Sequence, residues 1–161
     1  MESNRSTGNS PTSTSSGSRP THGLGEGSAA WTAAAASLAL AIVLGAFGAH
    51  ALEAALPADR LNAYGTASQY HFYSCFFLFA LALTRAWLGG EHRAAQRKLS
   101  IAQALWGWGT VVFCGSVYLV SVRGIIGLES ASWLGAIAPI GGTLLIAGAA
   151  YAAFAVLQLR R

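Results

Sequence analysis

"AAWTAAAASLALAIVLGAFGA", residues 29–49, contains no charged side chain and is built mainly of Ala, Leu and Gly. As a helix this stretch would span about 30 Å, the hydrocarbon thickness of a bilayer. Lipid cannot hydrogen-bond to backbone polar groups, so a segment that crosses a membrane in this way has to be helical. The stretch therefore predicts a first transmembrane helix.

Three further uncharged runs follow, at residues 64–84, 101–122 and 134–157. Across the 161 residues, 53% are hydrophobic and 10% are charged, whereas soluble domains carry about 25% charged residues. We therefore predict an all-α fold, a polytopic membrane four-helix bundle that occupies residues 29–161. The basic residues form no stripe suited to nucleic acid, so the expected partner is the lipid bilayer and not a nucleic acid.

Residues 1–28 differ in composition, because they are mostly Ser, Thr and Gly with little to bury. Such a segment cannot offset the entropy lost on ordering, so we predict a disordered tail. With four spans, this tail, the loop after the second run and the C-terminus lie on one side, and they hold most of the basic residues: Arg19, Arg85, Arg93, Arg97, Lys98, Arg160 and Arg161. The positive-inside rule then predicts a plasma or inner membrane protein with both termini cytoplasmic.

This topology brings the distinctive polar residues of the helices to the outer half of the membrane. The first run ends near His50, the second begins near Tyr70 and His71, and the third ends near Ser116 and Tyr118. Glu53 lies in the loop just beyond His50. Together these six residues form a candidate outer-leaflet polar cluster.

The histidines do not predict a metal site. His50 and Glu53 have the spacing of one helical turn, but a metal centre in a bundle needs several inward carboxylates, and no Asp or Glu lies within a run. His71 is expected to hydrogen-bond across helices, to Ser116 or Tyr118. We predict no catalytic, metal-binding or cofactor-binding residue, and we interpret Cys75 and Cys114 as small buried thiols.

Small residues indicate where helices approach one another. The first run carries them at four-residue spacing, at Ser37, Ala41, Gly45 and Ala49, the pattern that permits close helix packing in membranes. We assign the same packing role to further residues of the third and fourth runs: Gly115, Pro139, Gly141 and Gly142.

Four stretches occur in an order that resembles a known family: "GAFGAHAL" (45–52), "TASQYHFYS" (66–74), "FCGSVYL" (113–119) and "APIGGTLLIAG" (138–148). The chain is similar, over about residues 30–157, to domain-of-unknown-function family 423, the transmembrane protein 256-like small four-helix membrane proteins. The resemblance implies a multi-pass membrane protein and no established reaction, substrate or cofactor. Ser74 stands where the family often has a histidine, and Glu53 where it often has a basic residue.

Three functions fit these observations. The leading hypothesis is a non-enzymatic protein that assists membrane assembly, with a second copy or another membrane protein as partner, or binds a lipid or small ligand at the outer leaflet. The alternative is a transporter or channel for a small solute, lined by His71, Ser116 and Tyr118. A third is a haem b-binding redox protein that uses His50 and His71 as ligands.

Overall fold

The computed structural model describes residues 24–88, 92–128, 130 and 133–160 of the chain, and within this part every regular element is a helix. Four of these helices are long and apolar enough to cross a membrane. Their bounds are α1 Leu24–Phe47, α2 Ala58–Leu88, α3 Arg93–Val122 and α4 Leu134–Leu157. A short π-helix, η1 Gly48–Leu52, continues α1, and a 3-10 turn, η2 Gln158–Arg160, continues α4.

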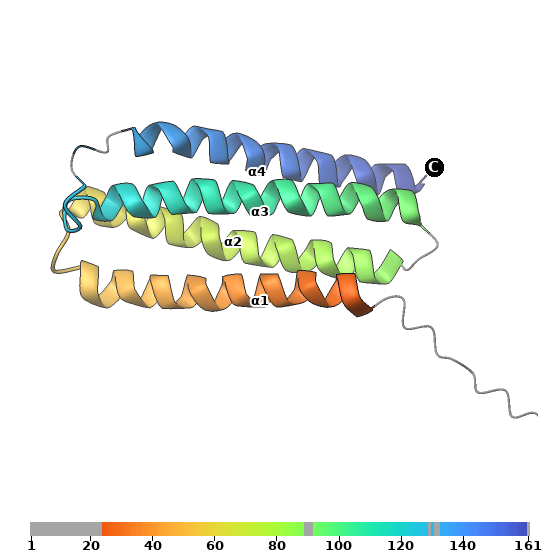
Figure 1. The fold of residues 1–161 in the computed structure, drawn as a ribbon, viewed down its shortest axis with the longest axis horizontal. Coiled ribbons are helices and arrows are strands. Elements are labelled where there is room, and N and C mark those ends of the chain that lie inside the picture. Colours follow the sequence, from red (N-terminus) through yellow and green to blue (C-terminus); the bar gives the residue numbers. More distant parts are fainter. Residues whose placement is uncertain (1–23, 89–91, 129, 131–132, 161) are drawn as a thin grey trace, which may run out of the picture.

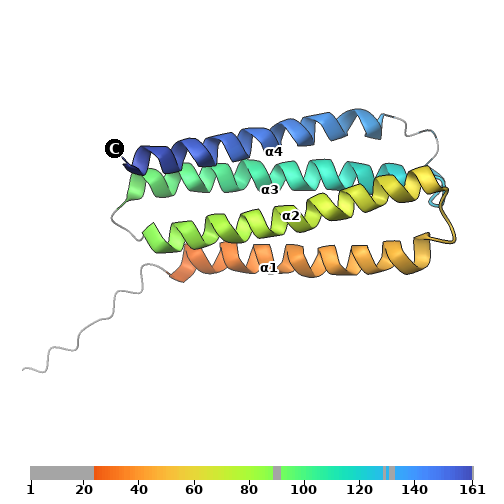
Figure 2. The same ribbon diagram turned by 180° about the vertical axis from the view of Figure 1, so that it is seen from behind.

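The helices run up and down in chain order and lie side by side as α1, α2, α3 and α4 (Figures 1 and 2). Each packs mainly on its neighbours in the chain, and the pair α3–α4 has the most extensive contact. We call the end where α1 begins and α4 finishes the termini end, and the opposite end, with the α1–α2 and α3–α4 connections, the distal end (Figure 1). The prediction of an all-α membrane fold with four spanning helices is confirmed.

Most of the helices extend beyond the uncharged runs that predicted them. α4 has the predicted bounds, but α2 begins six residues before Tyr64 and α3 begins eight residues before Ile101. Absence of charge marks the part of a helix that fits in hydrocarbon, whereas the helix itself continues into the interface, where charged side chains reach water. For the same reason residues 24–28, predicted from composition to belong to the tail, are helical. The remainder of the predicted tail, residues 1–23, lies outside the described residues.

Glycines bring α3 and α4 into close contact. A Cβ atom added at Gly141 would lie 2.3 Å from the backbone N of Phe113, and one added at Gly109 would lie 2.8 Å from the backbone N of Leu145. At Gly148 the added atom would be 3.0 Å from the backbone N of Trp106. Lipid tails are as apolar as the helices, so helix association in a membrane depends on such close van der Waals packing. Gly141 is therefore at the tightest of the contacts between the two helices.

The small-residue face of α1 departs from the predicted spacing. Ala41 is fully buried, but Ala49 is exposed, and Gly48 is buried in its place. At 3.6 residues per turn, a residue twelve positions after Ser37 has rotated about 120° around the helix, whereas one eleven positions after it has rotated only about 20°. The contact face therefore follows Ser37, Ala41 and Gly48, and the predicted packing role of Ala49 is corrected.

Of the other predicted packing residues, some make close contacts between helices and others do not. An added Cβ at Gly45 would contact the Ser68 hydroxyl at 3.3 Å, whereas one at Gly142 would reach only the edge of the Phe113 ring at 3.9 Å. An added Cβ at Gly115 would meet nothing within 4 Å, so this glycine makes no close helix contact. Pro139 is exposed near the start of α4, where a missing N–H group costs little.

The α3–α4 contact yields a test of packing. Gly141→Ala is expected to destabilise the purified protein by roughly 1–3 kcal/mol, because the backbone at Phe113 has to move away from the new methyl group. The free energy of unfolding can be measured by titration with SDS in mixed micelles, followed by far-UV circular dichroism. The control is Gly115→Ala, because a Cβ atom at Gly115 would enter open space. This variant is expected to be neutral or slightly stabilising. Equal stabilities of the two variants would contradict the close contact at Gly141.

Candidate functional site

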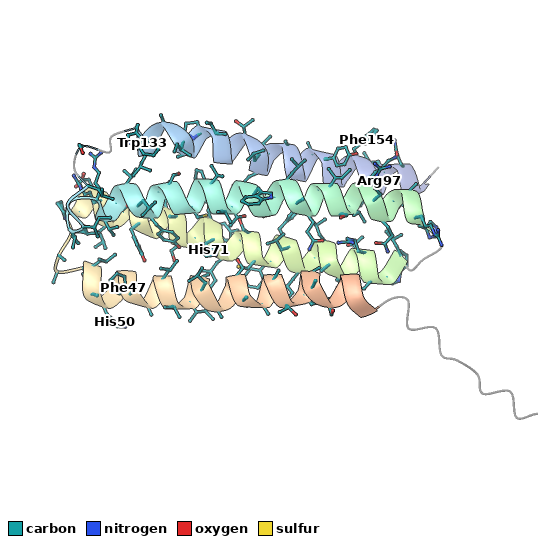
Figure 3. All side chains as sticks on the ribbon, in the orientation of Figure 1. Phe47, His50, His71, Arg97, Trp133 and Phe154 are labelled. Carbon is teal, nitrogen blue, oxygen red and sulfur yellow. The ribbon has the colours of Figure 1, made fainter. Side chains whose placement is uncertain are left out.

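A polar cluster lies where α1, α2 and α3 meet, and we call its five residues the His71 centre: the half-buried Ser37 and the buried His71, Ser74, Cys75 and Tyr118. His71 is only 6% exposed. Figure 3 shows it inside the bundle, well away from the labelled His50 near the distal end of α1. A titratable side chain buried within the membrane-spanning part of a protein is a candidate functional residue.

Hydrogen bonds connect the centre across α1 and α2. Ser37 Oγ lies 3.1 Å from His71 Nε2, and Cys75 Sγ donates to the same oxygen at 3.4 Å. His71 and Cys75 face Ser37 together because residues four apart share one side of a helix. The ring of Tyr118 on α3 meets the ring of His71 edge-on, with centroids 6.2 Å apart. Three helices are thus joined through a single histidine.

Two polar atoms of the centre have no hydrogen-bond partner among the described residues: His71 Nδ1 and Ser74 Oγ. If Ser37 donates its hydrogen to Nε2, neutral His71 carries its proton on Nδ1; if Nε2 carries the proton, Nδ1 is an acceptor. Either state leaves Nδ1 with capacity for one more bond. A buried polar group without a partner costs roughly 1–3 kcal/mol. The centre is therefore chemically suited to a small hydrogen-bonding molecule such as water.

The remaining residues of the predicted outer-leaflet cluster do not join this centre. Ser116 is buried, but its hydroxyl donates to the backbone oxygen of Phe113 on its own helix, at 2.9 Å. Tyr70 is 46% exposed and packs edge-on against Phe113. His71 therefore forms the predicted hydrogen bond across helices, but its partner is Ser37 and neither Ser116 nor Tyr118.

His50 and Glu53 lie at a different level from His71. Both are exposed at the distal end, and His50 follows Ser37, the partner of His71, by thirteen residues along the same segment. That separation corresponds to about 20 Å along the helix axis. The two histidines therefore do not face each other, and the arrangement expected for a haem held between them is not formed. Among the described residues no group of three His, Cys, Asp or Glu side chains could hold a metal ion.

A groove between α1 and α2 forms a second feature, and we call it the distal groove. Its volume is about 380 Å³, and its lining is Gly45, Gly48, Ala49, Glu53, Leu61, Tyr64, Gly65 and Ser68. Among the described lining residues Glu53 alone carries a charge, Ser68 and Tyr64 carry hydroxyl groups, and the other walls are apolar or glycine. Of the predicted polar cluster only Glu53 lines this groove.

Tyr64 fixes the shape of the distal groove. Its hydroxyl donates to the backbone oxygen of Leu44 at 2.8 Å, and its ring packs at a tilt of 55° against the ring of Tyr118, with centroids 4.7 Å apart. A Cβ added at Gly48 would lie 2.5 Å from the Tyr64 ring, so glycine is required where the ring crosses the helix. The π-helical turn Gly48–Leu52 begins at this point. Irregular turns of this kind are frequent at functional sites.

Sequence reasoning missed Ser37 as the partner of His71 and Tyr64 as the wall of the groove. The signal for the first was present, because His71 and Cys75 share one face of α2. A serine on a run of alanines was interpreted only as a small packing residue. No sequence pattern signals that the hydroxyl of Tyr64 reaches a backbone oxygen of another helix.

Comparisons with known proteins place the chain among membrane proteins without an assigned activity. A family described as protein of unknown function (DUF423) matches residues 44–142. The UPF0382 membrane protein YwdK of Bacillus subtilis is 40% identical over 111 residues, which cover 66% of this chain and 78% of that protein. The UPF0382 membrane protein SSP2132 of Staphylococcus saprophyticus is 35% identical over 113 residues, or 68% of this chain and 80% of that protein. No solved structure matches the chain.

The His71 centre can be tested by its effect on stability. Ser37→Ala removes the partner of both His71 and Cys75 and is expected to destabilise the bundle by about 0.6–1.7 kcal/mol, which are the average and the maximum measured for interhelical hydrogen bonds in a membrane protein. Unfolding in SDS mixed micelles gives the free energy. The control is Ser116→Ala, because its hydroxyl bonds within its own helix. A double-mutant cycle of Ser37→Ala with His71→Phe should show coupling, and additive effects would contradict the hydrogen bond.

Proposed function

The chain belongs to the DUF423 family of proteins of unknown function, and we propose that it is a non-enzymatic, multi-pass membrane protein that binds a lipid-like amphiphile. The proposed site is the distal groove between α1 and α2. The observation that supports it most is the composition of that groove, in which apolar and glycine walls lead to one carboxylate, Glu53, at the water boundary.

The size and the position of the groove agree with such a ligand. Pockets that bind small molecules have volumes of about 300–1,000 Å³ and mostly apolar walls with a few polar groups. At about 380 Å³ the distal groove could accept a headgroup and the first part of an acyl chain. The neighbouring surface of α1 is apolar, with Val43 and Phe47 exposed, so the rest of an acyl chain would continue along it.

The charge of the groove indicates the headgroup. A carboxylate near the membrane surface attracts a cation or a strong hydrogen-bond donor. It repels a headgroup whose phosphate carries no positively charged group. Glu53 supplies this carboxylate, and the Ser68 hydroxyl lies among the other lining groups. We therefore propose an amphiphile with an amine headgroup, of which phosphatidylethanolamine is the common membrane example.

We also propose that the distal end faces the outside of a plasma or inner membrane, so that both termini are cytoplasmic. Support comes from the basic residues at the termini end, where Arg85, Arg93, Arg97 and Lys98 lie at the end of α2 and the start of α3. Short loops rich in Lys and Arg remain cytoplasmic. In this orientation the amine lipid would be taken from the outer leaflet. Assembly with a second copy or with another membrane protein stays a prediction.

A second candidate function, passage of a small polar solute, is supported by the unpartnered polar atoms of the His71 centre. The test is osmotic swelling of liposomes that contain the protein, with urea and glycerol as probes. The wild type is expected to exceed protein-free liposomes, and His71→Phe to return the rate toward theirs. Background-level rates for both proteins would exclude passage of these solutes.

Binding of the amine lipid is tested with a variant that fills the groove. Gly65 lines the groove, and a Cβ added there meets nothing within 4 Å. Gly65→Leu should therefore fold like the wild type, occupy the groove and lower the affinity for dioleoylphosphatidylethanolamine by about tenfold or more, as expected when a buried apolar contact of 1.4 kcal/mol or more is lost. Native mass spectrometry of the detergent-purified protein measures the bound lipid.

Two further variants make this test specific. Gly115→Leu also enters open space but does not line the groove, so it is the matched control and should bind like the wild type. Glu53→Gln should weaken the amine lipid by roughly threefold to fivefold, as expected for one partly exposed charge pair. If Gly65→Leu and the wild type bind the amine lipid equally, the proposed site is wrong.

A further inference from the structure

A second hollow lies at the termini end, between the start of α3 and the end of α4, and we call it the basic hollow. Its volume is about 230 Å³. The polar part of its lining is His92, Arg93, Lys98 and Gln158, and the rest is alanine side chains and Leu159. Among the residues that the structure describes, each one that lines the hollow is basic or neutral, the opposite of the distal groove with its carboxylate. A cavity with this lining favours an anion.

The ammonium group of Lys98 is held at the hollow by groups of α4. Its Nζ donates to Gln158 Oε1 and lies 5.8 Å from the centre of the Phe154 ring. Figure 3 labels Phe154 near the end of α4 and Arg97 near the start of α3, both toward the termini end. Contact with an amide and an aromatic ring limits how far the side chain moves away into water. The positive charge is thus positioned before any ligand arrives.

The backbone adds to the attraction. The hollow includes Arg93, Ala94 and Ala95, the first residues of the long helix α3. The first turn of a helix presents N–H groups without intrahelical acceptors and carries the positive end of the helix dipole. No acidic side chain lies in this first turn, and His92 makes no side-chain hydrogen bond that would cap it. The helix start therefore reinforces the charges of Arg93 and Lys98.

Apolar surface adjoins the basic hollow on the membrane side. On α4, Phe154 is 51% and Leu157 60% exposed, and on α3, Ile101 is 40% exposed. A soluble anion would use only the charged part of this surface, whereas a phospholipid would use both parts. Basic pockets between transmembrane helices on the cytoplasmic side are typical sites for anionic headgroups.

We propose that the basic hollow binds the phosphate of an anionic phospholipid, with Arg93 and Lys98 as its charged contacts. Gln158 and the first N–H groups of α3 complete the polar contacts. The acyl chains lie along the exposed apolar surfaces of α3 and α4. This site is independent of the amine lipid proposed for the distal groove, because the two lie at opposite ends of the bundle and differ in charge.

The experiment uses the full chain in detergent at physiological ionic strength, with dioleoylphosphatidylglycerol as the probe and dioleoylphosphatidylcholine as the neutral comparison. Native mass spectrometry counts the lipids bound per chain. We expect one phosphatidylglycerol to be retained about thirtyfold more strongly than phosphatidylcholine, since Arg93 and Lys98 are two basic contacts and each contributes about 1 kcal/mol near a membrane surface. Arg93→Gln together with Lys98→Gln should abolish this preference.

Matched variants separate a specific site from general attraction. Arg97 has the same charge on the same helix and does not line the hollow, so Arg97→Gln should retain the preference. If Arg97→Gln loses as much as the double variant, or if the double variant binds like the wild type, the proposal is overturned. If the double variant does not fold because the Lys98 contact is lost, Arg93→Gln alone gives the same test, since Arg93 is at an exposed position.

Two further arms identify the source of the phosphate and keep the sites distinct. Displacement of phosphatidylglycerol by a millimolar excess of inorganic phosphate would assign the hollow to a soluble anion and overturn the lipid as its occupant. Gly65→Leu, which fills the distal groove, should leave phosphatidylglycerol binding unchanged. Loss of phosphatidylglycerol in that variant would contradict two independent sites, whereas loss of only the amine lipid supports both.

Discussion

Hydrocarbon offers no hydrogen-bond partner to a peptide group, and this constraint determines most of the structure. Each segment that enters the membrane has to satisfy its backbone internally, so it forms a helix. Once the helices exist, the hydrophobic effect no longer favours one helix surface over another, because lipid is equally apolar. What remains to order the bundle is close contact between backbones and the few polar side chains that need a partner.

These two influences operate in different parts of the bundle. Between α3 and α4, glycine removes the side chain so that the helices meet backbone to backbone, as at Gly141 and Phe113. Between α1 and α2, polar contacts add to the packing, because the hydroxyl of Ser37 meets His71 and the hydroxyl of Tyr64 reaches the backbone at Leu44. α1 is joined to the bundle mainly through α2, so these contacts matter most for its position. The groove between α1 and α2 lies where Gly45, Gly48 and Gly65 carry no side chain to fill the space.

The same division explains how far the sequence predicts the structure. The four spans follow from length and charge alone, and the bounds of α4 match the prediction because its uncharged run starts and ends with the helix. The contact face of α1 follows only in part, since a four-residue spacing rotates around the helix and brings Gly48 inward where Ala49 was expected. The partner of His71 does not follow, because periodicity tells which residues share a helix face but not the relative height of two helices. That height is set by packing, and it brings Ser37 rather than Ser116 to the imidazole.

The two hollows extend this reasoning from packing to ligands. Both lie at an end of the bundle, where a helix begins or finishes and the contact between neighbours opens. The charge differs between the ends, with Glu53 at the distal groove and Arg93 and Lys98 at the basic hollow. The basic end is also the end that the positive-inside rule assigns to the cytoplasm. In the proposed orientation one set of lysines and arginines would serve two purposes, because charges that orient a chain during insertion remain at the level of the phosphate groups afterwards. An acidic residue has no comparable influence on orientation. Topology therefore does not account for the carboxylate at the distal groove, which agrees with the ligand proposed for that end.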